Sequence, residues 1–146
     1  MVRTATKHDL PALLGLYRQL NPDDPILSPN AATAAWDRMA ASGMTVLVAE
    51  AGDTVAATCT LAVIANLTRG GRPYALVENV VTDTAHRRHG LARAVLHAAF
   101  DHAWAAGCYK VMLLTGSKRP ETLRFYEGVG LSQNKTGFQI RRPGGS

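Results

Sequence analysis

Two stretches near the start of the chain carry apolar residues at the spacing of amphipathic helices. The first predicts a helix that ends at Leu20 and has Asp9 in the position of an N-cap. Its apolar face consists of Leu10, Leu13, Leu14, Tyr17 and Leu20. The second stretch follows Ser28-Pro29 and predicts a helix over 30–42, which Gly43 ends.

The pattern then changes to runs that are rich in β-branched and apolar residues, which predict strands. Two of these runs flank the turn Ala51-Gly52-Asp53 and predict a hairpin. Helical spacing returns over 91–106 and, in a shorter segment, over 120–128. The predicted strands are Met44–Glu50, Thr54–Leu67, Tyr74–Thr82, Tyr109–Thr115 and Ser132–Arg142, the fourth being apolar enough for a buried strand.

The order of the predicted elements indicates the fold class. Two helices, a hairpin and then alternating strands and helices predict a mixed α/β sheet with helices on both faces. A length of 146 residues fits one domain, which we expect over 1–142, with a loose tail over 143–146. Hydrophobic residues make up 47% and charged residues 18%, so a core can form without disulfides or a metal.

Cysteine usage and the start of the chain bear on its location. Cys59 and Cys108 lie far apart, and neither belongs to a CxxC pair. Residues 1–10 include charged side chains and lack the apolar stretch of a signal peptide. We therefore expect two reduced, mostly buried thiols in a soluble, cytoplasmic protein that has no membrane segment.

Basic residues are concentrated in the second part of the chain. Residues 1–68 hold four basic and six acidic residues, whereas residues 69–146 hold twelve basic and five acidic residues. The resulting charges of −2 and +7 predict that the second part attracts an anion. Nucleic acid, an anionic surface and a phosphorylated cofactor all fit that charge, so charge alone does not choose among them.

The segment between a predicted strand and the helix over 91–106 has the features of a phosphate-binding loop. It reads Arg87-Arg88-His89-Gly90-Leu91-Ala92. A helix start leaves backbone N–H groups without partners and favours an anion. Gly90 and Ala92 allow phosphate oxygens to approach the main chain, and the two arginines add positive charge. A basic helix start on the surface, without a ligand, is the alternative explanation of this segment.

Three segments together resemble a known family. The loop is similar to the [QR]-x-x-G-x-[GA] signature of the GNAT acetyltransferases, whose loop amides bind the pyrophosphate of acetyl-CoA. Glu78-Asn79-Val80-Val81-Thr82 resembles the strand before that loop, and Phe125 to Leu131 resembles the FYExxGF segment. The resemblance implies the single-domain GNAT fold, whose sheet is mostly antiparallel and has a splayed central strand pair that makes a slot for the cofactor.

The resemblance also implies an activity, the transfer of an acetyl group from acetyl-CoA to a primary amine. The amine must lose a proton, and the leaving thiolate must gain one. Tyr126, in the FYE segment, is the candidate general acid, because a phenol is protonated at neutral pH. Glu78 is the candidate base, provided that it is partly buried beside the thioester. A core tyrosine and an exposed or acceptor-positioning glutamate are the structural alternatives.

The family pattern assigns cofactor-binding residues as well. The expected set is Val80, Val81 and Thr82 along the pantetheine arm, and Arg87, Arg88, His89, Gly90, Leu91 and Ala92 around the pyrophosphate. One position departs from the family, because Arg119 stands where many members have an asparagine that holds the pantetheine. Ser117, Thr115 and Thr122 are the candidates to replace it. His86 and His89 resemble half of a zinc site, but no second pair follows, so no metal is expected.

The acceptor remains open between several amines. The family acetylates amino-sugar phosphates, polyamines, aminoglycosides and protein lysines, and we expect a small-molecule amine. The stretch 69–72 and Arg141-Arg142 are candidates to meet an acceptor phosphate. Two other functions compete with catalysis: a basic nucleic-acid-binding module, against which the absence of known motifs argues, and a CoA-binding sensor without turnover. We expect no nucleic-acid or membrane partner, and dimers are common among relatives.

Overall fold

The sheet of the protein places its five strands side by side in the order of the chain. The first three pairings are antiparallel, and β4 pairs with β5 in parallel, so the expected mixed, mostly antiparallel sheet is confirmed. The computed structural model describes residues 1–144. Its strands are β1 (Val2–Thr4), β2 (Met44–Ala51), β3 (Thr54–Ile64), β4 (Tyr74–Thr82) and β5 (Val111–Leu113).

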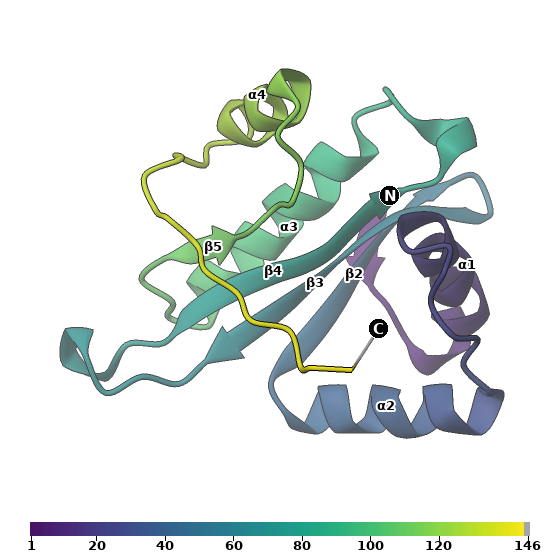
Figure 1. Cartoon of the computed structure of the whole chain (residues 1–146), viewed down its shortest axis with the longest axis horizontal. Helices are drawn as coiled ribbons and strands as arrows, with labels where there is room; N and C mark the ends of the chain where they lie inside the picture. Colours follow the sequence, from purple (N-terminus) through teal and green to yellow (C-terminus); the bar gives the residue numbers. More distant parts are fainter. Residues whose placement is uncertain (145–146) are drawn as a thin grey trace. The chain divides into compact units, whose positions relative to one another are not determined.

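Helices cover both faces of this sheet, as Figure 1 shows. The helices α1 (Leu10–Leu20) and α2 (Pro29–Ala41) lie on one face and α3 (Leu91–Ala105) lies on the other. The short 3-10 turns are η1 (Lys7–Asp9), η2 (Arg69–Gly71) and η3 (Thr84–His86). Ser28 caps α2, because its hydroxyl accepts a hydrogen bond from the Ala31 N–H at 3.2 Å.

The chain forms two compact units, Met1–Leu113 and Leu114–Ser146. The first contains the whole sheet with α1, α2 and α3, and the second contains α4 (Pro120–Gly128). Of the expected tail over 143–146, residues 143 and 144 form a turn, and residues 145 and 146 lie outside the described part of the chain.

The core of the first unit lies between the sheet and its helices. Side chains that are at most 1% exposed come mostly from β2, β3 and α3, and include Leu47, Val48, Leu61, Val95 and Leu96. Burying an aliphatic side chain of this kind contributes about 1.5–3 kcal/mol. Cys59 and Cys108 are also buried and carry free thiols, and burial raises the pKa of Cys59 to about 12. The expectation of reduced, buried cysteines agrees with this arrangement.

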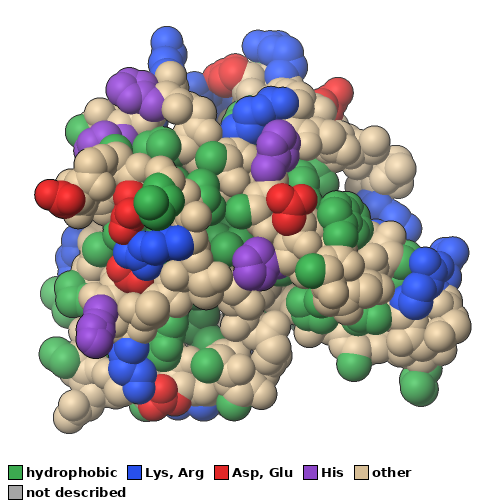
Figure 2. Space-filling model, turned by 180° about the vertical axis from the view of Figure 1, so that it is seen from behind, with side chains coloured by type: hydrophobic (Ala, Val, Ile, Leu, Met, Phe, Trp, Pro, Cys, Tyr) green, Lys and Arg blue, Asp and Glu red, His purple; other side chains and the backbone are tan. Residues whose placement is uncertain are grey.

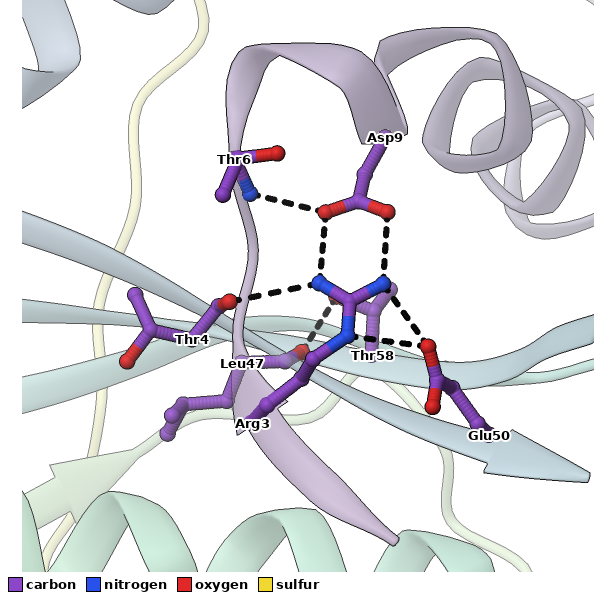
Figure 3. A network of polar contacts seen from close by, with 7 residues as sticks. All are labelled: Arg3, Thr4, Thr6, Asp9, Leu47, Glu50 and Thr58. Atoms are coloured by element: carbon purple, nitrogen blue, oxygen red, sulfur yellow. Dashed lines mark hydrogen bonds and ion pairs between the residues drawn. The ribbon is translucent and has the colours of Figure 1, made fainter.

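A polar clamp ties β1 to the start of α1 (Figure 3). The Arg3 guanidinium donates two hydrogen bonds of 2.8 Å to the carboxylate of Asp9 and pairs with Glu50 at 2.8 Å. Asp9 stands at the N-cap position of α1, as predicted, but its carboxylate makes no cap bond to the helix and accepts instead from the Thr6 N–H at 2.7 Å. Because the carboxylate is bonded in this way, mainly to Arg3, its pKa falls to about 2.

Two predicted strands need correction. Ser132–Arg142 forms no strand, and its apolar side chains Phe138 and Ile140 are 93% and 95% exposed, so the alternating pattern there buries no face. The strand predicted over 109–115 is only the half-buried β5, because the ladder ends at Leu113 and the Leu114 side chain is 68% exposed. In residues 1–144, no helix is long and apolar enough to cross a membrane.

Candidate functional site

The middle of β4 is distorted by a bulge. Glu78 pairs with Thr60 and Val81 pairs with Thr58, so Asn79 and Val80 stand opposite the single residue Cys59. Asn79 takes a left-handed backbone with φ of 54°, a conformation that asparagine adopts more readily than most residues. A bulge bends the strand and changes the direction of its side chains, which makes this position suitable for a site.

The edge of β4 that follows the bulge is not paired with β5. The parallel ladder joins Ala75, Leu76 and Val77 to β5 and ends there, whereas β4 continues to Thr82. The backbone groups of 78–82 that point away from β3 therefore have no β5 partner. Such an edge can pair with an extended amide-bearing ligand in the way that an added strand does. Val81 is 7% exposed and so also serves the core, while Val80 and Thr82 are half-buried.

The side chain of Glu78 lies on the sheet face that α1 covers. Its partner Thr60 lies on that face together with Thr58, since the Tyr17 hydroxyl of α1 lies beside both threonine hydroxyls. Cys59 points to the opposite face, where its thiol contacts the Val95 carbonyl oxygen at 3.5 Å. Glu78 is exposed, so the partial burial assumed for it in the sequence argument is wrong.

A pocket of about 460 Å³ adjoins this face of β4. It lies between α1 and α2, under the loop that joins them, and its lining includes Tyr17, Trp36 and Asn79. Burial raises the pKa of Tyr17, which keeps its hydroxyl protonated at neutral pH. The sequence pattern placed Tyr17 only on an apolar helix face. It did not indicate a site at Asn79, because no local pattern reveals a bulge.

The loop between η3 and α3 has the geometry expected for anion binding. Gly90 stands at the N-cap of α3 with φ of 76°, and Ala94 donates to its carbonyl oxygen at 3.0 Å. The helix offers no carbonyl partners to the N–H groups that precede Ala94. A Cβ placed on Gly90 would meet no atom within 4 Å, so open space lies beside the helix start. Arg87, Arg88 and His89 are exposed, and Leu91 and Ala92 are half-buried.

A hydrogen-bond network fixes the segment that leads into this loop. The Asp83 carboxylate accepts from the Gln19 amide at 2.7 Å and contacts the Nδ1 atom of His86 at 2.7 Å. Gln19 also accepts from the Thr84 N–H at 3.0 Å, so α1 holds the chain directly before the loop. These bonds, first that of Gln19, lower the pKa of Asp83. The sequence pattern suggested His86 only as half of a zinc-like pair and gave no sign of this positioning network.

The remaining candidate residues belong to the second unit. The hydroxyl of Ser117 donates to the hydroxyl of Thr122 at 3.2 Å and accepts from the Arg119 N–H at 3.3 Å. The candidates for the missing asparagine are thus brought together at the start of α4. Tyr126 is half-buried on α4 and packs edge-to-face on Phe125, with ring centroids 5.2 Å apart. This contact orients the ring that carries the candidate acid.

The histidines do not gather in one place. Among residues 1–144, no group of three His, Cys, Asp or Glu side chains is placed to hold a metal ion. Figure 2 shows the histidine side chains spread over several places on one side of the molecule. His86 is engaged by Asp83 rather than by a second histidine.

Comparison with known proteins decides the family. The model of the Acetyltransferase (GNAT) family matches residues 11–131 of this chain. The chain belongs to the GNAT acetyltransferase family. The structure of a putative acetyltransferase from Agrobacterium tumefaciens str. C58 matches with a TM-score of 0.92 and 50% sequence identity, covering 97% of this chain and 99% of its own. The GNAT fold expected from the resemblance is therefore confirmed.

Two curated relatives carry a more specific name. Glucosamine 6-phosphate N-acetyltransferase 1 of Oryza sativa subsp. japonica is 38% identical over 80% of this chain and 71% of its own length. Glucosamine 6-phosphate N-acetyltransferase of Trypanosoma brucei brucei is 30% identical over 95% of this chain and 93% of its own length. This GNAT chain is thus similar along most of its length to acyltransferases that are named for a phosphorylated amino sugar.

Proposed function

We propose that this GNAT protein transfers the acetyl group of acetyl-CoA to the primary amine of a small molecule, with an amino-sugar phosphate as the first acceptor to test. One observation carries the proposal: β4 has an unpaired edge over 78–82 that leads directly to the Gly90 loop at the start of α3. A long ligand with amides at one end and a diphosphate at the other suits an unpaired edge that is followed by an anion-binding loop.

Each end of the site has a defined task. The main chain of Val80, Val81 and Thr82 binds the pantetheine amides, and the amides from Gly90 to Ala92 bind the pyrophosphate with support from Arg87, Arg88, His89 and Leu91. Acetyl-CoA supplies the activated thioester. Ser117 and Thr122 take the place of the family asparagine in holding the pantetheine.

Proton transfer requires two further groups. Glu78 accepts the proton that the acceptor amine loses as its nitrogen attacks, directly or through one water. Tyr126 holds a proton on its hydroxyl and gives it to the departing sulfur. Glu78 directly precedes Asn79, which lines the pocket of α1 and α2, and its exposed carboxylate is open to an amine or to a water that relays the proton. A single catalytic domain over 1–142, a cytoplasmic location and a homodimer stay predictions.

The deciding experiment is a thiol-release assay with acetyl-CoA over a panel of amines. The panel holds glucosamine 6-phosphate, glucosamine, a polyamine, an aminoglycoside and a lysine peptide. We expect saturable turnover with a small-molecule amine, and glucosamine 6-phosphate gives the highest kcat/KM. Tight acetyl-CoA binding without turnover of any amine would instead establish the CoA-sensor alternative. Salt-sensitive binding of nucleic acid without acetyl-CoA binding would establish the nucleic-acid module.

A further inference from the structure

Three basic side chains gather around two tyrosines at the amino end of β4. The guanidinium carbon of Arg69 lies 5.4 Å from the ring centroid of Tyr109, and that of Arg72 lies 5.5 Å from it. The Lys110 ammonium lies 5.4 Å from the same centroid and 5.6 Å from that of Tyr74. The two rings meet edge-to-face at 6.4 Å. We call these five residues the basic–aromatic cluster.

The backbone builds this cluster from two separate segments. The Tyr109 N–H donates to the Pro73 carbonyl at 3.0 Å, and the Ala75 N–H donates to the Lys110 carbonyl at 3.0 Å. These bonds place Tyr109 and Lys110 beside Tyr74, and both residues lie outside the β4–β5 ladder. The arginines come from the η2 turn, where the Arg72 Nε atom donates to the Arg69 carbonyl at 3.2 Å. The turn therefore directs both arginines to the same ring.

The cluster holds excess positive charge. Among the described residues, no carboxylate forms an ion pair with Arg69, Arg72 or Lys110. All three charges lie around one ring centroid, so no two of them are farther apart than about 11 Å. Like charges at that spacing repel, and tyrosine faces compensate only in part. An anion that meets all three removes the repulsion, and a phosphate dianion has the charge and the acceptor oxygens to do so.

The position of the cluster separates it from the pyrophosphate loop. The loop follows the carboxyl end of β4, and the cluster lies at the amino end, about 26 Å away along the eight steps of the strand. Tyr74 and Glu78 are four residues apart, so their side chains share one face at a separation of about 13 Å. Arginine and lysine side chains can span part of that separation. The cluster thus lies on the approach to the candidate base and away from the cofactor phosphates.

We propose that the basic–aromatic cluster binds the phosphate monoester of the acceptor and selects phosphorylated amines over neutral ones. The proposal rests on the proposed acetyltransfer and names the chemistry of its acceptor. It excludes the 3′-phosphate of CoA as the ligand of the cluster, because that group belongs to the other end of β4. Arg69 and Lys110 are specificity residues in this scheme.

The test compares two acceptors in four proteins. The variants are Arg69→Gln/Lys110→Gln, which leaves the Arg72 bond of the turn intact, Lys110→Arg, and the control Arg38→Gln, which removes an exposed charge on α2. We expect the double variant to raise the KM for glucosamine 6-phosphate by on the order of 100-fold, since each charged hydrogen bond changes affinity about tenfold. The KM for glucosamine, kcat and the acetyl-CoA Kd stay within about twofold. Lys110→Arg keeps a cation in the cluster and retains the preference for the phosphorylated acceptor, whereas Arg38→Gln behaves like the parent protein.

A binding measurement makes the result independent of turnover. Inorganic phosphate is titrated into the parent protein and the double variant while the tyrosine ring resonances are followed by NMR, with Tyr74→Phe and Tyr109→Phe for assignment. Shifts of these two rings in the parent protein alone support the site, even if no amine is acetylated and the proposed function fails. Any of four results would overturn the proposal. In the binding test, this is an absence of shifts in the two tyrosine ring resonances. In the kinetic test, it is an unchanged KM for glucosamine 6-phosphate, equal KM changes for both acceptors, or turnover of neutral amines alone.

Discussion

The two ends of β4 present positive potential in different ways. At the carboxyl end, the proposed anion site is made mainly of main chain, with Gly90 at φ of 76° directly before α3. At the amino end, the charge comes from Arg69, Arg72 and Lys110 side chains around Tyr109. A backbone site depends on a conformation and on open space, whereas a side-chain site depends on residue identity.

This difference matches what each end has to recognise. The cofactor is the same in every turnover of a GNAT enzyme, so a backbone site that tolerates changes of neighbouring side chains suits it. The acceptor differs between members of the family, and side chains can be exchanged without rebuilding the fold. The contrast predicts that a change in glycine geometry abolishes cofactor binding, while a change of side chain at the amino end only shifts acceptor preference.

The largest effect is expected from Gly90→Glu. The new side chain occupies the open space beside the helix start, and its carboxylate repels the pyrophosphate. The affinity for acetyl-CoA therefore falls by more than about 100-fold. Isothermal titration with CoA measures the change. Gly52→Glu is the matched control, since Gly52 also has a positive φ, of 60°, and open space. A common loss of stability with unchanged CoA affinity in both variants would refute the loop assignment.

A smaller effect is expected at Tyr126, which belongs to neither end of β4. Tyr126→Phe keeps the ring that packs on Phe125 at 5.2 Å and removes only the hydroxyl. We expect kcat to fall by about 100-fold with an unchanged acetyl-CoA Kd, because general acid catalysis contributes on that order. Steady-state kinetics and thermal unfolding test this. Turnover at the parental rate would remove Tyr126 as the acid.

Glu78→Gln tests whether the face between the two ends supplies the base. A carboxylate can accept the proton that the amine loses, whereas the amide of glutamine cannot. The variant is therefore slower by about tenfold or more near neutral pH. The measurement is kcat/KM against pH with glucosamine 6-phosphate. A variant profile that coincides with the parental one would point to another base.

Sequence patterns predicted the helices and strands that bury one face. They failed where a strand depends on a partner strand that is distant in the sequence. The predicted bounds of β4 and of the helix over 120–128 match the structure, since local periodicity and Gly or Pro boundaries define them. The same periodicity misled over 132–142, where no partner strand receives the alternating side chains. β1 escaped notice because three residues are too short to show a period.

The site was predictable to the extent that its motifs are local. The Gly90 loop could be found from the sequence, because a helix start and a glycine are sequence signals. The bulge at Asn79, the position of Tyr17 beside Thr60 and the meeting of Arg69 with Lys110 depend on strand register and on contacts between distant segments. A single sequence without those contacts gives no signal for them.

The Arg3 clamp provides a reference that lies outside both ends of β4, and Asp9→Asn gives the smallest expected effect on activity. The pKa of Asp9 falls from 3.8 to about 2 in the folded protein, chiefly through Arg3, so its stabilisation is complete above about pH 5 and is lost as the pH falls towards 2. We expect the variant to lose about 2 kcal/mol of unfolding free energy at pH 7 and the deficit to shrink between pH 4 and pH 2. Urea unfolding of both proteins across this range measures it. Because the clamp touches neither anion site, kcat and both KM values at pH 7 should stay parental. A deficit in unfolding free energy that does not change with pH would mean that packing, and not the charge of Asp9, stabilises the start of α1.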